Sequence, residues 1–189
     1  MGGTFDPPHI GHLAVAEEVR EEAGLGEVVF IPARIPPHKS GERLLDAATR
    51  MELVELAIRG NPRFSASDLE LRREGPSYTI DTVRALQRER GPEAQIFLIV
   101  GADNVLEFGS WKDPSGLLDH CTLLVATRPG VSTDGLPGWL SARMRLVRVT
   151  GFEVSSTEVR DRLRRGLSVR YLVPDAVLDA IERRALYCG

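Results

Sequence analysis

The clearest helical pattern in the chain follows a short opening rich in glycine and proline. Over residues 11–23 the apolar side chains of Leu13, Ala16 and Val19 share one face, glutamates occupy other positions, and Gly24 follows. Apolar residues at this spacing are typical of an amphipathic helix, and a glycine commonly ends one. We therefore predict a helix over 11–23 that ends at the glycine.

Several short runs are almost wholly apolar, which is typical of parallel strands covered on both faces. The most pronounced run covers residues 95–100 and stops at Gly101. Residues 64–71 alternate less clearly between apolar and polar positions, so they favour a strand with less force. The predicted strands are 28–31, 64–71, 95–100, 121–126 and 145–149.

The segments between these strands carry helical patterns with recognisable ends. Pro174 stands where a proline suits the first turn of a helix, since the missing N–H would have no partner there. The remaining predicted helices are 46–59, 77–90, one between 101 and 121, 155–165 and 174–185.

Strands that alternate with helices indicate an α/β fold. Right-handed crossovers then give a single doubly wound parallel sheet with helices on both faces. A chain of 189 residues with 42% hydrophobic content suits one well-packed domain, so we expect residues 1–189 to form a single domain. Ligands of such sheets bind beyond the carboxyl ends of the strands. Three segments with suggestive chemistry fall at such ends, namely 32–39, 101–103 and 127–130.

Composition excludes several function classes. A formal net charge of −3 argues against a protein that coats nucleic acid. No apolar stretch approaches the roughly 18 residues of a membrane span, and no signal peptide is recognisable at the start. Cys121 and Cys188 show no spacing typical of a disulfide framework or a zinc site, which favours a reducing cytoplasm. The oligomeric state stays open, a homo-oligomer included.

The opening combines a glycine turn with two imidazoles at the start of a helix. Residues 2–12 read GGTFDPPHIGH, so His9 and His12 stand three positions apart and point the same way. Small residues let backbone N–H groups approach a phosphate, and a helix N-terminus adds partial positive charge. Two donors aimed at one place suit the charge that builds on a phosphoryl group in transfer. The alternative is a turn with two surface histidines.

The whole string resembles the signature of nucleotidyltransferases that carry an HxGH motif. The resemblance is closest to the bacterial nicotinate mononucleotide adenylyltransferases, in which GGTFDPxHxGH is followed by six further motifs in a fixed order. This chain carries the same motifs in that order, and Val159 replaces the usual isoleucine. They are PPHK at 36–39, SYTIDT at 77–82, GADN at 101–104, Trp111, RPG at 128–130 and SSTEVR at 155–160.

The resemblance implies a Rossmann-like fold and transfer of an adenylyl group from ATP to nicotinate mononucleotide in NAD synthesis. It implies catalytic roles for His12 and His9. The residues implied to bind ATP and its phosphates are Gly2, Gly3, Thr4, Phe5, Lys39, Ser155, Ser156, Thr157 and Arg160. The residues implied to bind the mononucleotide are Thr79, Asp103, Trp111, Lys112 and Arg128. Trp111 would stack on the pyridine ring, and backbone N–H groups of Thr79 and Lys112 would hold its carboxylate.

Several of these residues also have an ordinary structural explanation. Ser155 and Glu158 have the spacing of a capping box, so Ser155 is predicted to be a helix N-cap whether or not it binds phosphate. Asp103 could equally cap a helix, a lone lysine such as Lys39 is usually solvated, and a tryptophan such as Trp111 usually packs in a core.

Three alternatives remain beside the main hypothesis. The chain could be another HxGH enzyme, such as a phosphopantetheine adenylyltransferase or a cytidylyltransferase, although the SYT motif and Trp111 argue against it. It could use nicotinamide mononucleotide equally well, or be a nucleotide sensor without turnover. No set of carboxylates forms a metal cage, so we predict no protein metal site and expect Mg²⁺ to arrive with ATP.

The start of the chain departs from the pattern of a doubly wound sheet. In such a fold a strand leads into the phosphate-binding glycine turn, yet Met1 alone precedes Gly2 in this sequence. We therefore expect the first strand to be missing, with either apolar residues encoded upstream or a protein that folds poorly and holds the glycine turn loosely.

Overall fold

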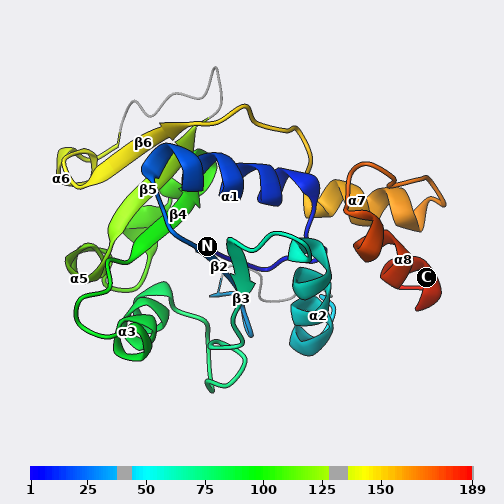
Figure 1. The fold of residues 1–189 in the computed structure, drawn as a ribbon, viewed down its shortest axis with the longest axis horizontal. Coiled ribbons are helices and arrows are strands. Elements are labelled where there is room, and N and C mark those ends of the chain that lie inside the picture. The colour runs from blue at the N-terminus through cyan, green and yellow to red at the C-terminus, as the bar shows by residue number, and fades with distance from the viewer. Residues whose placement is uncertain (38–43, 128–135, 189) are drawn as a thin grey trace.

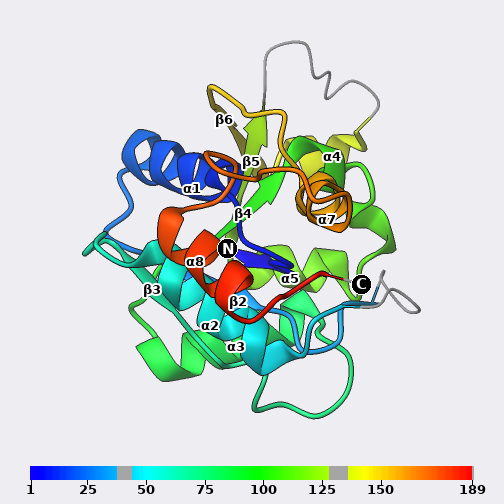
Figure 2. The same ribbon diagram turned by 90° about the vertical axis from the view of Figure 1, so that its right-hand side faces the viewer.

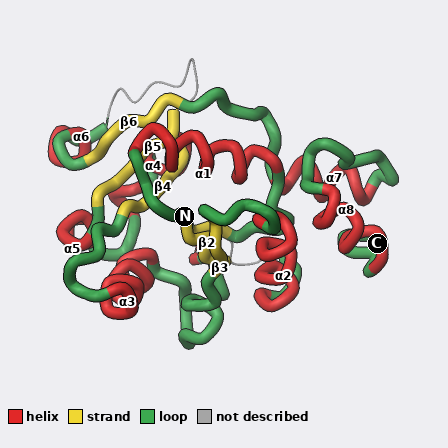
Figure 3. Tube along the Cα trace, viewed as in Figure 1, coloured by secondary structure: helices red, strands yellow, loops and turns green. Residues whose placement is uncertain are grey.

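The computed structural model describes residues 1–37, 44–127 and 136–188, and it confirms the α/β class (Figures 1 and 3). Strands and helices alternate over most of the chain. The strands are β1 (Gly2–Gly3), β2 (Val28–Pro32), β3 (Phe64–Ala66), β4 (Phe97–Gly101), β5 (Thr122–Thr127) and β6 (Met144–Arg148). The helices are α1 (Ile10–Ala23), α2 (Ala47–Ile58), α3 (Thr79–Arg90), α4 (Ala102–Val105), the 3₁₀ turn η2 (Phe108–Ser110), α5 (Pro114–His120), α6 (Gly138–Ser141), α7 (Ser156–Arg164) and α8 (Asp175–Arg183).

The strands form two parallel sheets rather than the single sheet that was predicted. Their orders are β1-β2-β3 and β4-β5-β6. The first strand, which we expected to be missing, is present as the two residues of β1, where Gly2 pairs with Ile31 and Gly3 with Pro32. Among the described residues β1 pairs with β2 and not with β4, so the two sheets stay separate.

The second sheet is covered on both faces, as its apolar strands predicted. Successive side chains of a strand point to opposite faces. Ile99 and Leu124 accordingly belong to the core cluster that includes α1. Leu98 and Leu123, one position earlier, belong to the cluster formed with α3 and α5. Figure 1 shows the same division, with α1 on one side of β4–β6 and α3 and α5 near the other.

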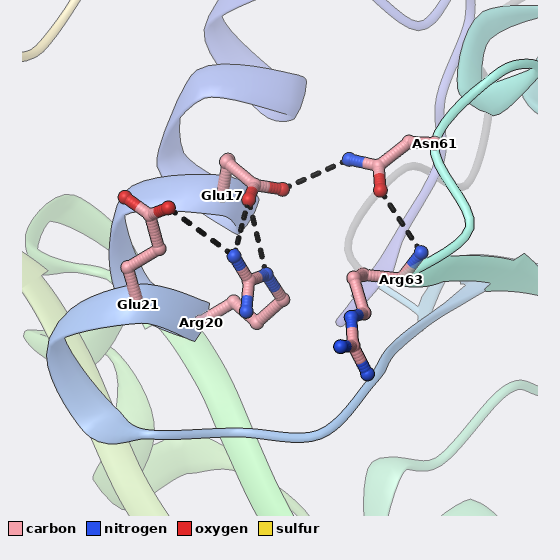
Figure 4. Close-up of polar contacts among 5 residues, drawn as sticks. All are labelled: Glu17, Arg20, Glu21, Asn61 and Arg63. Atoms are coloured by element: carbon pink, nitrogen blue, oxygen red, sulfur yellow. Dashed lines mark hydrogen bonds and ion pairs between the residues drawn. The ribbon is translucent and has the colours of Figure 1, made fainter.

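Polar contacts attach α1 to the turn before β3 (Figure 4). Asn61 Nδ2 donates a hydrogen bond of 2.9 Å to Glu17 Oε2, and Arg20 Nε donates to the other oxygen of the same carboxylate at 3.0 Å. These bonds hold the pKa of Glu17 below its ordinary value, with the bond from Arg20 the largest cause. The helix that carries the two motif histidines is thereby fixed to the first sheet.

A buried arginine joins the opening loop to α2. Arg50 is 1% exposed, and its guanidinium donates to the carbonyl oxygens of Thr4, Ala33 and Leu45 at 2.7, 2.7 and 3.0 Å. A buried cation is tolerated when its N–H groups are satisfied, and here they satisfy three main-chain oxygens in return. The bond from Arg50 to Thr4 O therefore fixes the main chain of the loop between β1 and α1.

The predicted element ends agree with the structure to within one or two residues, with few exceptions. Residues 64–71 are a strand only as far as Ala66, because the chain then turns and Arg72 N donates to Asp68 O. α6 was not predicted. No helix in the described part of the chain is long and apolar enough to cross a membrane.

Candidate active site

A cavity of about 810 Å³ lies where the opening loop, the end of β4 and the start of α7 meet. It brings together residues that are far apart in the chain. Most of the residues proposed from the sequence line it, namely Gly2, Gly3, Thr4, Phe5, His9, His12, Thr79, Asp103, Trp111, Ser155, Ser156 and Thr157. Residues near 100 and residues near 155 therefore share one site although they come from different elements.

The two motif histidines form a stacked pair at the start of α1. Their ring centroids are 3.6 Å apart with an interplanar angle of 26°, and His9 is the N-cap residue. The backbone N–H of His9 donates to Nδ1 of His12 at 3.2 Å. Because Nδ1 accepts this bond, a neutral His12 carries its proton on Nε2. The Nε2–H group is then a hydrogen-bond donor on the side of the ring away from the helix start.

Burial keeps both imidazoles neutral at neutral pH. It lowers the pKa of His9 from 6.5 to about 4. For His12, burial and then the neighbouring His9 lower the pKa to about 3. In the absence of an anion, both rings are therefore uncharged polar groups rather than cations.

These shifts predict a loss of stability in mild acid. Below pH 6.5 the unfolded chain binds protons on both histidines, whereas the folded protein does not until the pH approaches 4. The free energy of unfolding should therefore fall by up to about 1.4 kcal/mol per pH unit for each histidine as the pH drops from about 6.5 to 5. Urea denaturation at several pH values in this window measures the slope.

A His12→Gln variant supplies the comparison, since one of the two titrating rings is removed. Its stability should depend less steeply on pH than that of the wild type in the same window. Equal slopes for the two proteins would show that His12 is not held neutral by the fold.

Two glycines of the opening are required by close packing. A Cβ atom on Gly3 would lie 2.9 Å from the ring of Phe5, and one on Gly11 would lie 3.0 Å from Val154 and 3.1 Å from His9 Nδ1. Phe5 itself adopts a left-handed backbone with φ 50°. The ring of Phe5 also meets His12 edge-on at 5.0 Å. The glycines thus allow the loop to press against the histidine pair.

The first turn of α7 also lines the cavity, next to the histidine loop. Ser155 is its N-cap, and the side chain accepts a hydrogen bond of 3.1 Å from Glu158 N, as the capping-box spacing predicted. Ser156 Oγ donates to Pro7 O at 2.9 Å, which ties this turn to the histidine loop. The positive end of a helix dipole next to Ser155, Ser156 and Thr157 favours a bound anion.

Arg160, predicted to contact phosphate, does not line the cavity in the described structure. The side chain is 6% exposed. Nη1 donates to Asp6 O at 2.8 Å, and Nη2 donates to Thr157 Oγ1 at 3.3 Å. The guanidinium therefore lies beneath the loop, and direct contact with a phosphate stays a prediction.

The start of α3 and Trp111 line another part of the cavity. Thr79 is the first residue of α3, so its N–H is among the N-terminal amides that a helix leaves without an intrahelical acceptor. Trp111 follows η2, and its ring lies 5.1 Å from that of Phe108. An aromatic face beside helix-terminal amides can accommodate a flat ring that carries an anionic substituent.

Lys112 points its ammonium group elsewhere. Nζ lies 2.9 Å from Asp81 Oδ2 and 4.5 Å from the centroid of the Tyr78 ring. Lys112 is not among the described residues that line the cavity, so the backbone contact that the resemblance implied stays a prediction. Asp103 lines the cavity from the first turn of α4.

Sequence reasoning missed a polar network behind α3. Thr82 Oγ1 donates to Glu70 Oε1 at 2.6 Å, and Arg73 Nη2 lies 3.0 Å from Thr82 Oγ1 and 3.4 Å from Tyr78 O. Glu70 is buried and lines the cavity. Residues 68–74 are dense in charge and resemble a solvated surface, so the sequence gives no signal that Glu70 is buried.

Two of the residues proposed from the sequence, Lys39 and Arg128, fall outside the described residues. Within the described ranges, no three His, Cys, Asp or Glu side chains are placed to hold a metal ion. Cys121 and Cys188 are both free thiols, and burial raises the pKa of Cys121 to about 11.

Comparison with known proteins places these features in context. The family model described as cytidylyltransferase-like matches residues 1–162. A relative from Moorella thermoacetica is 44% identical over 99% of this chain and 89% of its own length. One from Exiguobacterium sibiricum is 46% identical over 99% of this chain and 96% of its own length. Both carry the name probable nicotinate-nucleotide adenylyltransferase.

Solved structures share the fold. The nicotinic acid mononucleotide adenylyltransferase of Plasmodium falciparum, complexed with NaAD, superposes with a TM-score of 0.79 at 18% identity, covering 98% of this chain and 94% of that one. The same enzyme complexed with APC gives a TM-score of 0.78 at 17% identity, covering 98% of this chain and 94% of the other.

Proposed function

The chain belongs to the cytidylyltransferase-like family and, within it, to the nicotinate-nucleotide adenylyltransferases, and we propose that it transfers an adenylyl group from ATP to nicotinate mononucleotide. A phosphate oxygen of the mononucleotide forms a bond to the α-phosphorus of ATP. The bond from that phosphorus to the β-phosphate oxygen breaks, and pyrophosphate leaves. The product is nicotinate adenine dinucleotide, a precursor of NAD.

The observation that carries this proposal is the arrangement of the cavity. The stacked pair of His9 and His12 and the first turn of α7 line the cavity, and so do Trp111 and Thr79, the first residue of α3. The first two features suit phosphates, and the other two suit a flat ring with an anionic substituent. A single cavity thus offers places for both substrates of an adenylyl transfer.

His12 acts on the phosphoryl group in transfer. Its Nε2–H donates to a non-bridging oxygen, and the approach of phosphate favours the protonated ring, which adds positive charge where negative charge builds. His9 supports this ring by stacking and by the bond from its backbone N–H. No protein nucleophile is needed, because the attacking phosphate is already an anion.

The phosphates of ATP are held by main-chain groups and small polar side chains. Residues 2–5 and 155–157, which all line the cavity, supply these groups. Mg²⁺ enters as part of the ATP substrate and shields charge on the leaving pyrophosphate. We propose that Lys39 and Arg160 also help to bind the phosphates of ATP. Arg160 would do so through the opening loop, since it donates a hydrogen bond to Asp6 O.

The mononucleotide binds where Thr79, Asp103 and Trp111 line the cavity. Trp111 stacks on the pyridine ring, and Asp103 accepts hydrogen bonds from ribose hydroxyls. The backbone N–H groups of Thr79 and Lys112 hold the carboxylate, and Arg128 contacts the phosphate.

Two free thiols among the described residues suit the reducing cytoplasm, where we propose that the protein works.

A product assay tests the proposal. The purified protein is incubated with ATP, Mg²⁺ and nicotinate mononucleotide, and both products are quantified by chromatography. We expect nicotinate adenine dinucleotide and pyrophosphate to form in equal amounts, and neither to form without the mononucleotide. Binding of both substrates without product would instead indicate a nucleotide sensor. Turnover of phosphopantetheine in place of the mononucleotide would indicate another HxGH enzyme.

A further inference from the structure

A segment near the end of the described chain reaches the loop that carries the motif histidines. After α8 the chain turns back, and Tyr187 Oη donates a hydrogen bond of 2.7 Å to Asp6 Oδ1. These residues are 181 positions apart. Figure 2 shows this last segment in red beyond α8.

Asp6 lies in an environment that gives this bond particular weight. The residue is 1% exposed, and Oδ2 is buried without a hydrogen-bond partner. A buried carboxylate requires hydrogen-bond donors and nearby positive charge. Arg50 provides charge, since Asp6 raises the pKa of its guanidinium against the larger opposing effect of burial. Tyr187 provides the hydrogen bond to Oδ1.

The phenol is held in its donating form. Burial, followed by the charge of Asp6, raises the pKa of Tyr187 well above its ordinary value. Its backbone adopts a left-handed conformation with φ 66°. Tyr187 also packs against the core cluster of α2, α7 and α8, so the segment is docked.

Other contacts hold the same loop by its main chain. Arg50 holds Thr4 O, Arg160 holds Asp6 O, and Ser156 holds Pro7 O, at distances of 2.7, 2.8 and 2.9 Å. The bond from Tyr187 instead fixes a side chain, three residues before His9. Because the Asp6 side chain is buried, its position constrains the path of the main chain from Asp6 to the start of α1.

We propose that Tyr187 is a positioning residue for adenylyl transfer, which acts through Asp6 to place the histidine pair. This inference rests on the proposed function. Neither Tyr187 nor Asp6 is among the described residues that line the cavity, so neither is expected to touch a substrate. The effect should therefore fall on kcat, through the placement of His12, more than on either KM.

The test is Tyr187→Phe, which removes the hydroxyl and keeps the packing of the ring. We expect kcat to fall about 10-fold, since a small displacement of a catalytic group is costly. Both KM values should change less than about 2-fold. The matched control is Tyr171→Phe, because Tyr171 has the same left-handed backbone, with φ 67°, but is 79% exposed. Its kcat should equal that of the wild type.

A double-mutant cycle distinguishes a positioning role of Tyr187 from a general effect on stability. In an Asp6→Ala background, Tyr187→Phe should cause no further loss of kcat, since the bond is already absent. All rates are measured well below the unfolding midpoint of each variant. An unchanged kcat in Tyr187→Phe, or a further full loss in the Asp6→Ala background, would overturn the inference.

Imidazole NMR signals give a readout that does not need turnover. Tyr187→Phe should shift the ring signals of His9 and His12 and leave those of the exposed His120 unchanged. Unshifted signals from the pair would contradict positioning even if Asp6→Ala did not fold. A wild type that makes no dinucleotide would refute the proposed function instead, while these shifts would still test the link between Tyr187 and the histidines.

Discussion

Replacing His12 with alanine should lower kcat by roughly 100-fold or more, which is the scale of losing one preorganised donor to a developing charge. The ring is partly buried, and its Nδ1 accepts a hydrogen bond from the backbone N–H of His9, so Nε2–H is directed by the fold before substrate arrives. Both KM values should change far less than kcat, since the bond to the phosphoryl group strengthens in the transition state. Steady-state kinetics with each substrate varied in turn measures both quantities.

The matched control is His120→Ala. His120 ends α5 and is exposed, and Arg84 Nε donates to its Nε2 at 3.2 Å. This variant should keep the wild-type kcat. A His12→Ala variant that also kept full kcat, with the fold verified by circular dichroism, would remove His12 from the catalytic role.

The acid, nicotinate mononucleotide, should be preferred over the amide by about 100-fold or more in kcat/KM. The first-turn N–H of Thr79 and the backbone N–H of Lys112 are both donors, and the dipole of α3 favours negative charge at this end. A carboxylate accepts from both donors. The amide would place its own NH₂ group against one of them, and buried donors left unpaired are costly.

Kinetics with the two mononucleotides under identical conditions decide this point. Equal kcat/KM values would refute recognition of the carboxylate by backbone amides. They would also support the broader alternative, in which the enzyme uses nicotinamide mononucleotide equally well.

The regular parts of the fold were predictable because their patterns are local. The apolar run of β4 and the amphipathic pattern of α1 each need only a few neighbouring positions to be recognised. Ser155 was predicted as an N-cap for the same reason. The division into two sheets was not predictable from periodicity, because it depends on which strands pair across the fold, and β1 pairs with β2 but not with β4 among the described residues.

The candidate site was predictable where its residues occur in ordered motifs. His9, His12, Thr79, Trp111 and the first turn of α7 all line one cavity, although the sequence gives no distances between them. The burial of particular polar side chains could not be predicted from the sequence.

Glu70 stands in a charged stretch and is nevertheless buried, and Arg160 occupies a motif position and is nevertheless turned beneath the loop. Such outcomes depend on partners that lie far away in the sequence. The roles proposed for individual site residues, and the expectation of a single domain, remain predictions.

The contacts that hold the histidine loop also determine the order in which the molecule can assemble. They join residues separated by 149, 154 and 181 positions. Closing such long loops costs chain entropy that local helices and hairpin-range contacts do not incur, so these bonds form late on a folding pathway. During refolding, helical circular dichroism should therefore recover before adenylyl transfer activity does.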